Sequence, residues 1–324
     1  MKRILSLMSL MFLSPIFAQS YAPEAGVAGS TAIEPNSPLF VAWATGVTVE
    51  RGYVNKANPS LVVSGSNRAS AGVPQNAVGP ANGSVVCLGD EGSAILTFEL
   101  PIINGPGFDF AVFENGGPAF LELGFVEVSS DGINFFRFPA HSQTQTATQI
   151  GTFGTPSAPF LNNLAGKYGS KGTPFDLTDI PDNQLLNKNK ITHVKVIDVV
   201  GSIDPLYATY DSHGNAVNDS FPTPFNSGGF DLDAVGVIHQ STLGIDDASR
   251  KAIALYPNPA SERFYIRNLE ETAKIKIYDL SGRIVFEKNI QDEEAIPVSG
   301  LNTGMYIVEI HTGTKKVNER LVVK

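Results

Sequence analysis

Residues 192–200 read Thr192-His-Val-Lys-Val-Ile-Asp-Val-Val200, and this pattern decides the fold. Apolar and polar side chains alternate through Val194, Lys195 and Val196, which is the period of a β-strand with one buried face. Asp198 falls on the same face as the two valines. A carboxylate is therefore expected among inward-facing residues, where it requires a partner.

Similar short segments recur along the first two thirds of the chain, separated by clusters of Gly, Pro, Asn and Asp. They are Leu39–Thr45, Ser93–Leu100, Asp109–Phe113, Phe125–Ser129 and Asp231–Ile238. Long stretches with a helical period are missing, so we predict an all-β fold, with residues 19–240 forming a jelly-roll-like β-sandwich. Regular periodicity fades over residues 142–189, which we interpret as long surface loops, where binding function commonly lies.

Length, cysteine content and charge narrow the class of protein. The 324 residues suggest two domains. Cys87 is the single cysteine, so no intramolecular disulfide forms, and we expect its side chain to be buried. Residues 19–240 carry nine Lys and Arg against twenty Asp and Glu. This acidity argues against a nucleic-acid partner and favours multivalent cations as counterions.

The N-terminus has the features of a secretory signal peptide over residues 1–18. Lys2 and Arg3 precede the apolar run from Ile4 to Phe12, and Ala18 offers a small residue for cleavage. The run is shorter than the roughly 20 residues of a spanning helix, and nothing later in the chain resembles one. We therefore expect export to the periplasm or beyond, and no transmembrane segment in the mature chain.

A polar linker, residues 241–253, precedes a second β-rich unit, residues 254–324. This unit contains Leu255-Tyr-Pro-Asn-Pro-Ala, Ile275-Lys-Ile-Tyr-Asp-Leu-Ser-Gly-Arg and Gly300-Leu-Asn-Thr-Gly-Met-Tyr-Ile-Val, and ends in Arg320-Leu-Val-Val-Lys. The residues describe a small antiparallel sandwich of immunoglobulin-like type. Ser281-Gly282 is expected to form a hairpin turn, and Met305–Ile310 a strand.

The order and spacing of these four blocks resemble a type A C-terminal sorting domain of the type IX secretion system. The residues that carry the resemblance are Pro257, Asn258, Pro259, Gly282, Gly304 and Tyr306. The resemblance implies two partners, the outer-membrane translocon and a sortase-like peptidase that joins the protein to surface lipopolysaccharide. It also implies an extracellular location on the outer surface of a Gram-negative bacterium.

The first domain is similar to a family of bacterial cell-surface domains that has no settled activity. The similarity rests on Leu88-Gly-Asp-Glu-Gly-Ser, Asp109-Phe-Ala-Val-Phe-Glu-Asn-Gly, Val126-Glu-Val-Ser-Ser-Asp-Gly and Gly229-Phe-Asp-Leu-Asp-Ala-Val-Gly-Val. The Val126 segment also resembles a strand and turn of galactose-binding-like jelly rolls.

Clustered carboxylates suggest a calcium site. Asp231 and Asp233 are two apart in a strand, so we expect both to project from one face toward one cation, and Ca²⁺ takes six to eight such oxygens. The full set of candidate ligands is Asp198, Asp211, Asp219, Asp231 and Asp233, and Asp109, Glu114 and Asn115 bracket another strand. The alternative is that these side chains make turns and cap backbone amides.

A glycan or other small molecule is the second expected ligand, with Tyr207, Tyr210 and Asn215 as contacts in a polar loop. No spacing indicates a catalytic site, so we predict no catalytic residues and no enzyme activity. The sequence favours an exported, calcium-stabilised ligand-binding or adhesion protein. A secreted polysaccharide hydrolase and a structural envelope protein without a small ligand stay open as alternatives.

Overall fold

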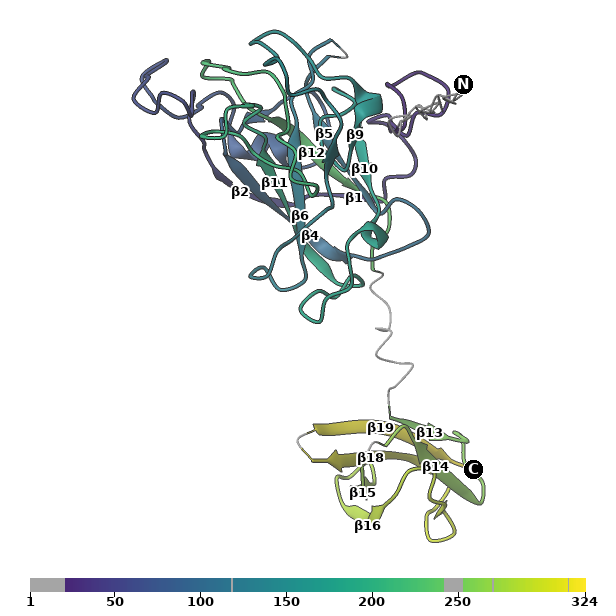
Figure 1. Cartoon of the computed structure of the whole chain (residues 1–324). Helices are drawn as coiled ribbons and strands as arrows, with labels where there is room; N and C mark the ends of the chain where they lie inside the picture. The colour runs from purple at the N-terminus through teal and green to yellow at the C-terminus, as the bar shows by residue number, and fades with distance from the viewer. Residues whose placement is uncertain (1–20, 118, 242–252, 270, 314) are drawn as a thin grey trace, which may run out of the picture. The chain divides into compact units, whose positions relative to one another are not determined.

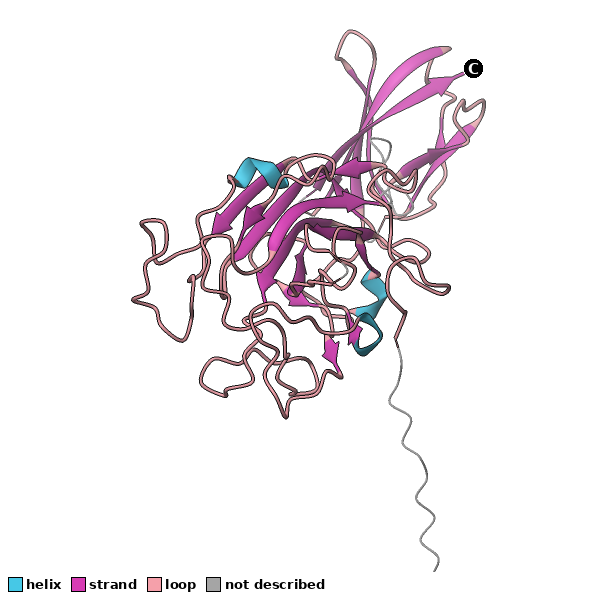
Figure 2. Cartoon of the chain, turned by 90° about the horizontal axis from the view of Figure 1, so that it is seen from above, coloured by secondary structure: helices cyan, strands magenta, loops and turns pink. Residues whose placement is uncertain are grey.

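A computed structural model describes residues 21–117, 119–241, 253–269, 271–313 and 315–324 (Figure 1). The chain divides into two compact units between Ser241 and Thr242. The described residues form strands, loops and three short 3₁₀ turns, η1 (Pro74–Ala77), η2 (Ala158–Phe160) and η3 (Leu177–Asp179). Figure 2 shows that strands and loops make up most of the chain. The predicted all-β class is confirmed. The signal peptide and most of the predicted linker lie outside the described residues.

Two antiparallel sheets form the first unit. One has the order β1 (Ala42–Trp43), β12 (Asp231–Val237), β5 (Phe110–Glu114) and β10 (Thr173–Phe175), with β3 (Val86–Cys87) also paired to β12. The other has the order β2 (Gly46–Glu50), β4 (Ser93–Ile102), β11 (Ile191–Asp198), β6 (Gly124–Ser129) and β7 (Phe136–Arg137). A small pair, β8 (His141–Ser142) and β9 (Leu161–Asn162), lies apart from both sheets.

The core of this unit lies between the two sheets, because inward-facing residues of both belong to one buried cluster. Val194 and Val196 of β11 pack there with Val235 and Val237 of β12. Lys195 between the two valines is only partly buried, as the alternation predicts. Cys87 is buried, also as predicted.

Residues 142–189 are more ordered than their composition suggests, and the prediction of surface loops throughout is wrong. Pro174 and its neighbours form β10, an edge strand on β5, and Phe175 stacks on Phe110 with ring centroids 5.4 Å apart. Leu161 and Leu164 are also buried. Proline is tolerated on edge strands, where its missing N–H leaves no ladder bond unmade, so a Pro-rich segment still joined the sheet.

The second unit contains a sheet of β13 (Ala254–Tyr256), β14 (Arg263–Arg267) and β17 (Ile296–Pro297). A second sheet has the order β16 (Ile284–Ile290), β15 (Ala273–Tyr278), β18 (Gly304–Thr312) and β19 (Lys315–Val323). The unit has its own buried core, which includes Phe264, Ile275 and Val308. It therefore does not require apolar residues of the first unit to exclude water.

Candidate functional site

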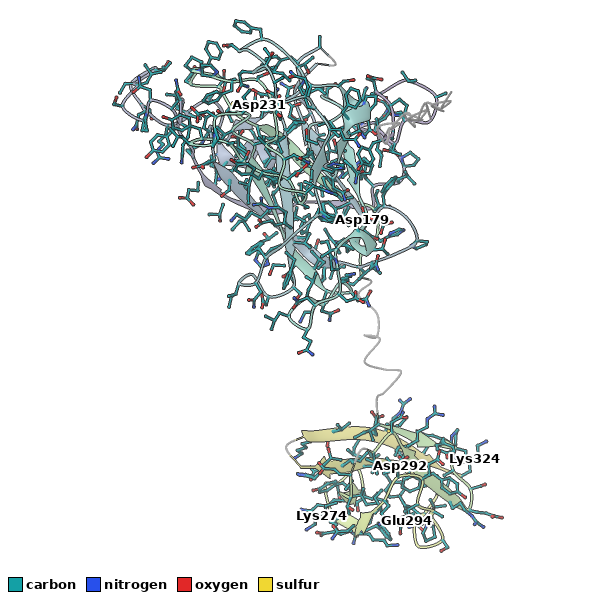
Figure 3. All side chains as sticks on the ribbon, in the orientation of Figure 1. Asp179, Asp231, Lys274, Asp292, Glu294 and Lys324 are labelled. Atoms are coloured by element: carbon teal, nitrogen blue, oxygen red, sulfur yellow. The ribbon has the colours of Figure 1, made fainter. Side chains whose placement is uncertain are left out.

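Acidic side chains gather at one end of the first sandwich. Glu114 ends β5 and Asp231 begins the neighbouring antiparallel strand β12, so both lie at the same end of one sheet. Asp198 ends β11 in the other sheet, and Glu122 and Asp90 come shortly before the first residues of its neighbours β6 and β4. Figure 3 labels Asp231 near this end of the unit. The topology thus collects carboxylates that are far apart in sequence.

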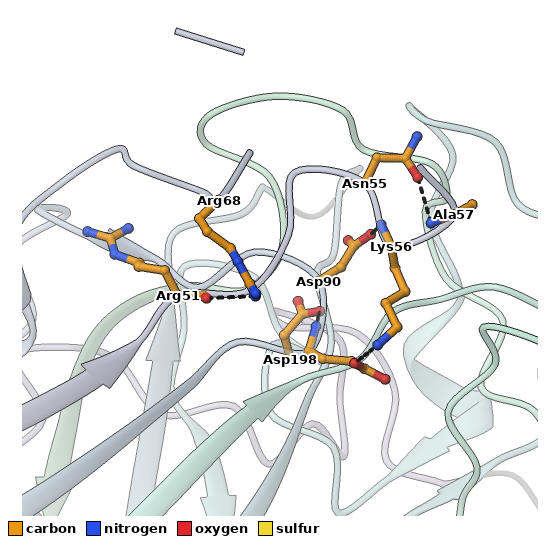
Figure 4. Close-up of polar contacts among 8 residues, drawn as sticks. Arg51, Asn55, Lys56, Ala57, Arg68, Asp90 and Asp198 are labelled. Atoms are coloured by element: carbon orange, nitrogen blue, oxygen red, sulfur yellow. Dashed lines mark hydrogen bonds and ion pairs between the residues drawn. The ribbon is translucent and has the colours of Figure 1, made fainter. Parts of the chain in front are cut away.

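Asp198 links the two sheets. Its side chain accepts a hydrogen bond from the backbone N–H of Phe230, 2.7 Å away, which leads into β12 of the opposite sheet. It accepts a second from the N–H of Glu91, 3.1 Å away, in the turn that precedes β4 of its own sheet. Asp198 is only 2 % exposed, so these amides compensate part of the loss of water. Figure 4 shows it beside Asp90, whose carboxylate accepts from the N–H of Lys56 at 2.6 Å.

Asp219 is held in the same way. Its carboxylate accepts from the N–H of Leu123 at 2.9 Å and of Ser220 at 2.7 Å. A cavity of about 10 Å³ is lined by the carboxyl-bearing residues Asp90, Glu122, Asp198 and Asp219, together with loop residues. That volume is about the room that one water molecule requires.

Glu114, Glu122 and Asp231, by contrast, receive few or no hydrogen bonds from neighbouring groups. Glu114 is 1 % exposed, yet neither of its side-chain oxygens has a hydrogen-bond partner, and Asp231 Oδ1 has none either. Glu122 makes no side-chain hydrogen bond within the described part of the chain. These three residues line one pocket of about 260 Å³, with Asn115, Thr223 and other loop residues.

Burial raises the pKa values of all these carboxyl groups. The pKa of Asp231 rises to about 6 and that of Asp219 to about 7, in each case because burial disfavours the charged form. The pKa of Asp90 also rises to about 7. Burial, followed by repulsion from Asp231, raises the pKa values of Glu114 and Glu122 well above their ordinary range. None of these groups forms an ion pair among the described residues.

Two exposed aromatic rings border the same pocket. Phe153 and Phe225 stack with centroids 5.9 Å apart and ring planes 29° apart, and both line the pocket. Phe153 is 78 % exposed and Phe225 is 38 % exposed. Two loops distant in sequence bring these rings together, one in residues 143–157 and the other just before β12. Exposed stacked rings beside buried acceptors give a pocket with an apolar rim and a polar floor.

The predicted aspartate cluster is not assembled as a metal site. Among the described residues, no three His, Cys, Asp or Glu side chains are placed to hold an ion as they stand. Asp233 is the extra residue of a β-bulge between Leu232 and Ala234, and its carboxylate accepts from the N–H groups of Asn82 and Gly83. The bulge interrupts the regular alternation, and Asp233 does not line the pocket that contains Asp231. That Asp231 and Asp233 share one cation stays a prediction.

Asp211 is likewise occupied by its own loop. Its carboxylate accepts from the backbone N–H groups of Ser142, His213 and Asn215, which holds its pKa below the ordinary range in spite of burial. The side chain of Asn215 donates to the same carboxylate at 3.2 Å. These contacts are those of the turn-forming alternative.

The predicted ligand contacts lie apart from the pocket at the acidic end. Tyr210 is exposed and forms a bridge with Ala216, and Tyr207 is partly buried. Neither tyrosine, nor Asn215, lines the pocket that contains Glu114. The aromatic residues that do line it, Phe153 and Phe225, were not predicted.

Sequence reasoning also missed Glu122 as a site residue. It stands between Leu121 and Leu123, which are both buried. A carboxylate inside an apolar run is a signal that could have found it, as it did for Asp198.

The residues of the resemblance in the second unit hold its strands together. Asn258 donates from Nδ2 to the carbonyl of Arg320 at 2.6 Å and accepts from the N–H of Val322 at 2.9 Å, so the Pro-Asn-Pro segment is fixed on β19. Gly282 has a φ of 81° in the turn between β15 and β16, a conformation that favours glycine. Tyr306 donates its hydroxyl to the carbonyl of Asn302 at 2.8 Å.

Residues 254–324 match the family described as the secretion system C-terminal sorting domain. The second unit is therefore a sorting domain of the type IX secretion system, and the protein is secreted through that system and associates with the outer surface of a Gram-negative cell. A sorting domain of this kind implies interaction with the secretion machinery. Within the described residues, no helix has the length and apolarity to cross a membrane.

No curated protein matches the chain. Among solved structures it has a distant likeness to PorZ, a surface component of the type IX secretion system of Porphyromonas gingivalis, at 12 % identity and a TM-score of 0.21. The match covers 74 % of this chain and 30 % of PorZ. A β-glucuronidase of Faecalibacterium prausnitzii is 11 % identical, with a TM-score of 0.23, and the match covers 88 % of this chain and 45 % of the enzyme. The chain thus spans less than half of either protein, and likenesses at these scores carry no argument about its function.

We predict that deletion of residues 254–324 abolishes surface display and leaves the first unit folded, since each unit has its own core. Immunodetection on intact cells measures display, and circular dichroism of the truncated protein measures folding. Normal surface levels of the truncated protein would contradict the assignment of the sorting domain.

The buried carboxyl groups predict that the cation-free protein loses stability as pH rises. A raised pKa in the folded state means that folding takes up protons, so this stability is complete below about pH 4 and is lost as pH passes through 6 to 7 and above. One pKa unit corresponds to about 1.4 kcal/mol, so Asp219 alone contributes a few kcal/mol to the difference between pH 4 and pH 8.

The free energy of unfolding of the first unit, measured with urea in chelator at several pH values, tests this dependence. Glu114→Gln should flatten the profile, whereas Glu99→Gln, an exposed carboxyl on β4, should leave it unchanged. A free energy of unfolding that rises from pH 5 to pH 8 would show that the cluster is ionised in the folded state.

Proposed function

We propose that this secreted, cell-surface protein is a ligand-binding or adhesion module whose ligand enters the pocket between Phe153 and Glu114. The observation that carries the proposal is the exposed Phe153–Phe225 pair at a pocket of about 260 Å³. Soluble proteins rarely leave paired aromatic rings in water beside a cavity unless something covers them. The volume is near the lower end of the range for small-molecule sites.

A glycan fits this arrangement better than a wholly apolar ligand. Sugar rings have flat apolar faces that stack on aromatic side chains and hydroxyl groups that donate hydrogen bonds. Two residues that line the pocket, Glu114 and Asp231, have buried acceptors without donors, namely the Glu114 oxygens and Asp231 Oδ1. Each of these buried acceptors gains a partner when a hydroxyl donates to it, which favours binding.

The proposal has no catalytic step. The polysaccharide-hydrolase alternative requires turnover, and the structural-envelope alternative requires that no glycan or small molecule bind at all. The same experiment separates the three.

The secreted protein is tested for binding on an array of bacterial and host polysaccharides, followed by measurement of the Kd and of released sugars. We predict saturable binding without release of product. Phe153→Ala and Phe225→Ala should each weaken binding about tenfold or more, equivalent to about 1.4 kcal/mol. Phe108→Ala is the matched control, because Phe108 is as exposed as Phe225, at 38 %, and does not line the pocket.

Unchanged affinity in both pocket variants would overturn the assignment of the pocket. Release of sugars would favour the hydrolase, and no binding of any glycan or small molecule would favour the structural protein.

A further inference from the structure

The carboxylates at the acidic end differ in how many hydrogen bonds they receive. Asp198 and Asp219 each receive two backbone N–H groups, one on each oxygen. Asp233 and Asp211 are also held by amides. A carboxylate with both oxygens satisfied in this way needs no metal to explain its burial.

Glu114 has no such explanation. Both of its oxygens are buried without a partner, although the amides of Asn115 and Gly116 lie near enough to moderate its pKa. A β-carbon added at Gly116 would lie 2.5 Å from one Glu114 oxygen and 2.4 Å from the carbonyl oxygen of Phe120, so this carboxylate occupies space that only glycine leaves open. A buried carboxylate without partners requires an explanation, and a bound ion supplies one.

We propose that Glu114, Glu122 and Asp231 bind one divalent cation, Ca²⁺, at the floor of the pocket. The three carboxylates line the same cavity, and Asn115, Thr223 and Ser227 add neutral oxygen atoms around it. Calcium accepts six to eight oxygen ligands in flexible geometry, a number that these side chains and water together supply. This inference deepens the proposed function by placing the cation beneath the aromatic rim.

The side chains must rotate to coordinate the ion, because the described residues contain no preassembled group of three ligands. Such rotation breaks few contacts. Both Glu114 oxygens and Asp231 Oδ1 have no hydrogen-bond partner among the described residues. The Asn115 and Gly116 amides lie near Glu114, and the Cys87 thiol and Arg51 guanidinium lie near Asp231. The aspartates with two amide donors, by contrast, would have to give up those bonds. The cation site is therefore expected on the glutamates and Asp231.

Calcium is favoured over an organic cation because the three carboxylates line one cavity, where a single small ion can be shared by all of them, whereas the ammonium groups of a polyamine are spaced along a chain. Magnesium is disfavoured because its octahedral shell is small and it retains several waters. Both remain arms of the test.

The test is thermal unfolding and isothermal titration calorimetry of the full mature chain at pH 7.5, in chelator and with added CaCl₂, MgCl₂ or spermidine. We expect Ca²⁺ to bind with a stoichiometry of one and to raise the Tm of the first unit by several degrees at a hundredfold excess over Kd. The unfolding of the sorting domain should not respond. Mg²⁺ and spermidine should give much smaller shifts.

Glu114→Gln preserves the size of the side chain and should weaken Ca²⁺ binding at least tenfold. Glu99→Gln and Asp233→Asn are the controls and should bind Ca²⁺ as the parent protein does. Circular dichroism at pH 5 checks that each variant is folded, and Glu122→Gln replaces Glu114→Gln if the latter is not. A Tm indifferent to Ca²⁺, a response to spermidine alone, or equal affinity in the folded glutamate variant would each overturn the proposal.

Failure of the cation site is distinguishable from failure of the proposed function. Glycan binding measured in chelator, where the oxygens of Glu114 and Asp231 hold no cation, and its loss in Phe153→Ala test the pocket without the cation site.

Discussion

The carboxylate of Asp198 is the contact on which the acidic end of the sandwich depends. It lies at the end of β11 in one sheet and accepts the amide of Phe230 at the start of β12 in the other. The preceding residue, Gly229, has a φ of 73°, and a β-carbon there would lie 2.7 Å from the backbone of Gly89, so glycine lets the two segments pass closely. The two sheets are thus joined by a buried charge-bearing group at the point where Glu114 and Asp231 leave their strands.

The contact between Asp198 and Phe230 also positions the neighbouring acids. Once the strand ends are fixed, Glu114, Glu122 and Asp231 are brought into one region with too few amide donors for all of them. Repulsion and burial then raise their pKa values together. The end of the domain that holds these unsatisfied acids is also where the Phe153–Phe225 pair is exposed. Polar groups without partners and exposed aromatic rings thus occur together in one pocket.

Much of the fold could be predicted from local patterns. The alternation around Val194 and Val196 predicted β11 and the burial of Asp198, because one face of a strand is set by its own sequence. The strand at residues 173–175 was missed, since its place in the sheet comes from pairing with β5, which lies about sixty residues earlier in the chain. The bulge at Asp233 was missed for a similar reason. Its carboxylate is bound by amides of residues 82 and 83, and no local pattern reports such a contact.

The site was predicted only in part, because hydrogen-bond donors decide which acids are free. Asp231 belongs to both the predicted set and the pocket. Glu122, Phe153 and Phe225 line the pocket because the tertiary fold brings their segments there. The sorting domain was readily predicted because its signal lies in consecutive residues, and the family match covers the same range, residues 254–324.

The carboxyl groups of Glu114 and Glu122 are buried without adequate hydrogen-bond donors. Carbon-13 NMR of the glutamate side-chain carboxyl carbons, titrated with pH in chelator and assigned with the Gln variants, measures the consequence for their protonation. Both residues should have midpoints well above the ordinary value of 4.5. Midpoints at or below 4.5 for both glutamates would contradict this expectation, because they would show that the folded protein already satisfies these charges.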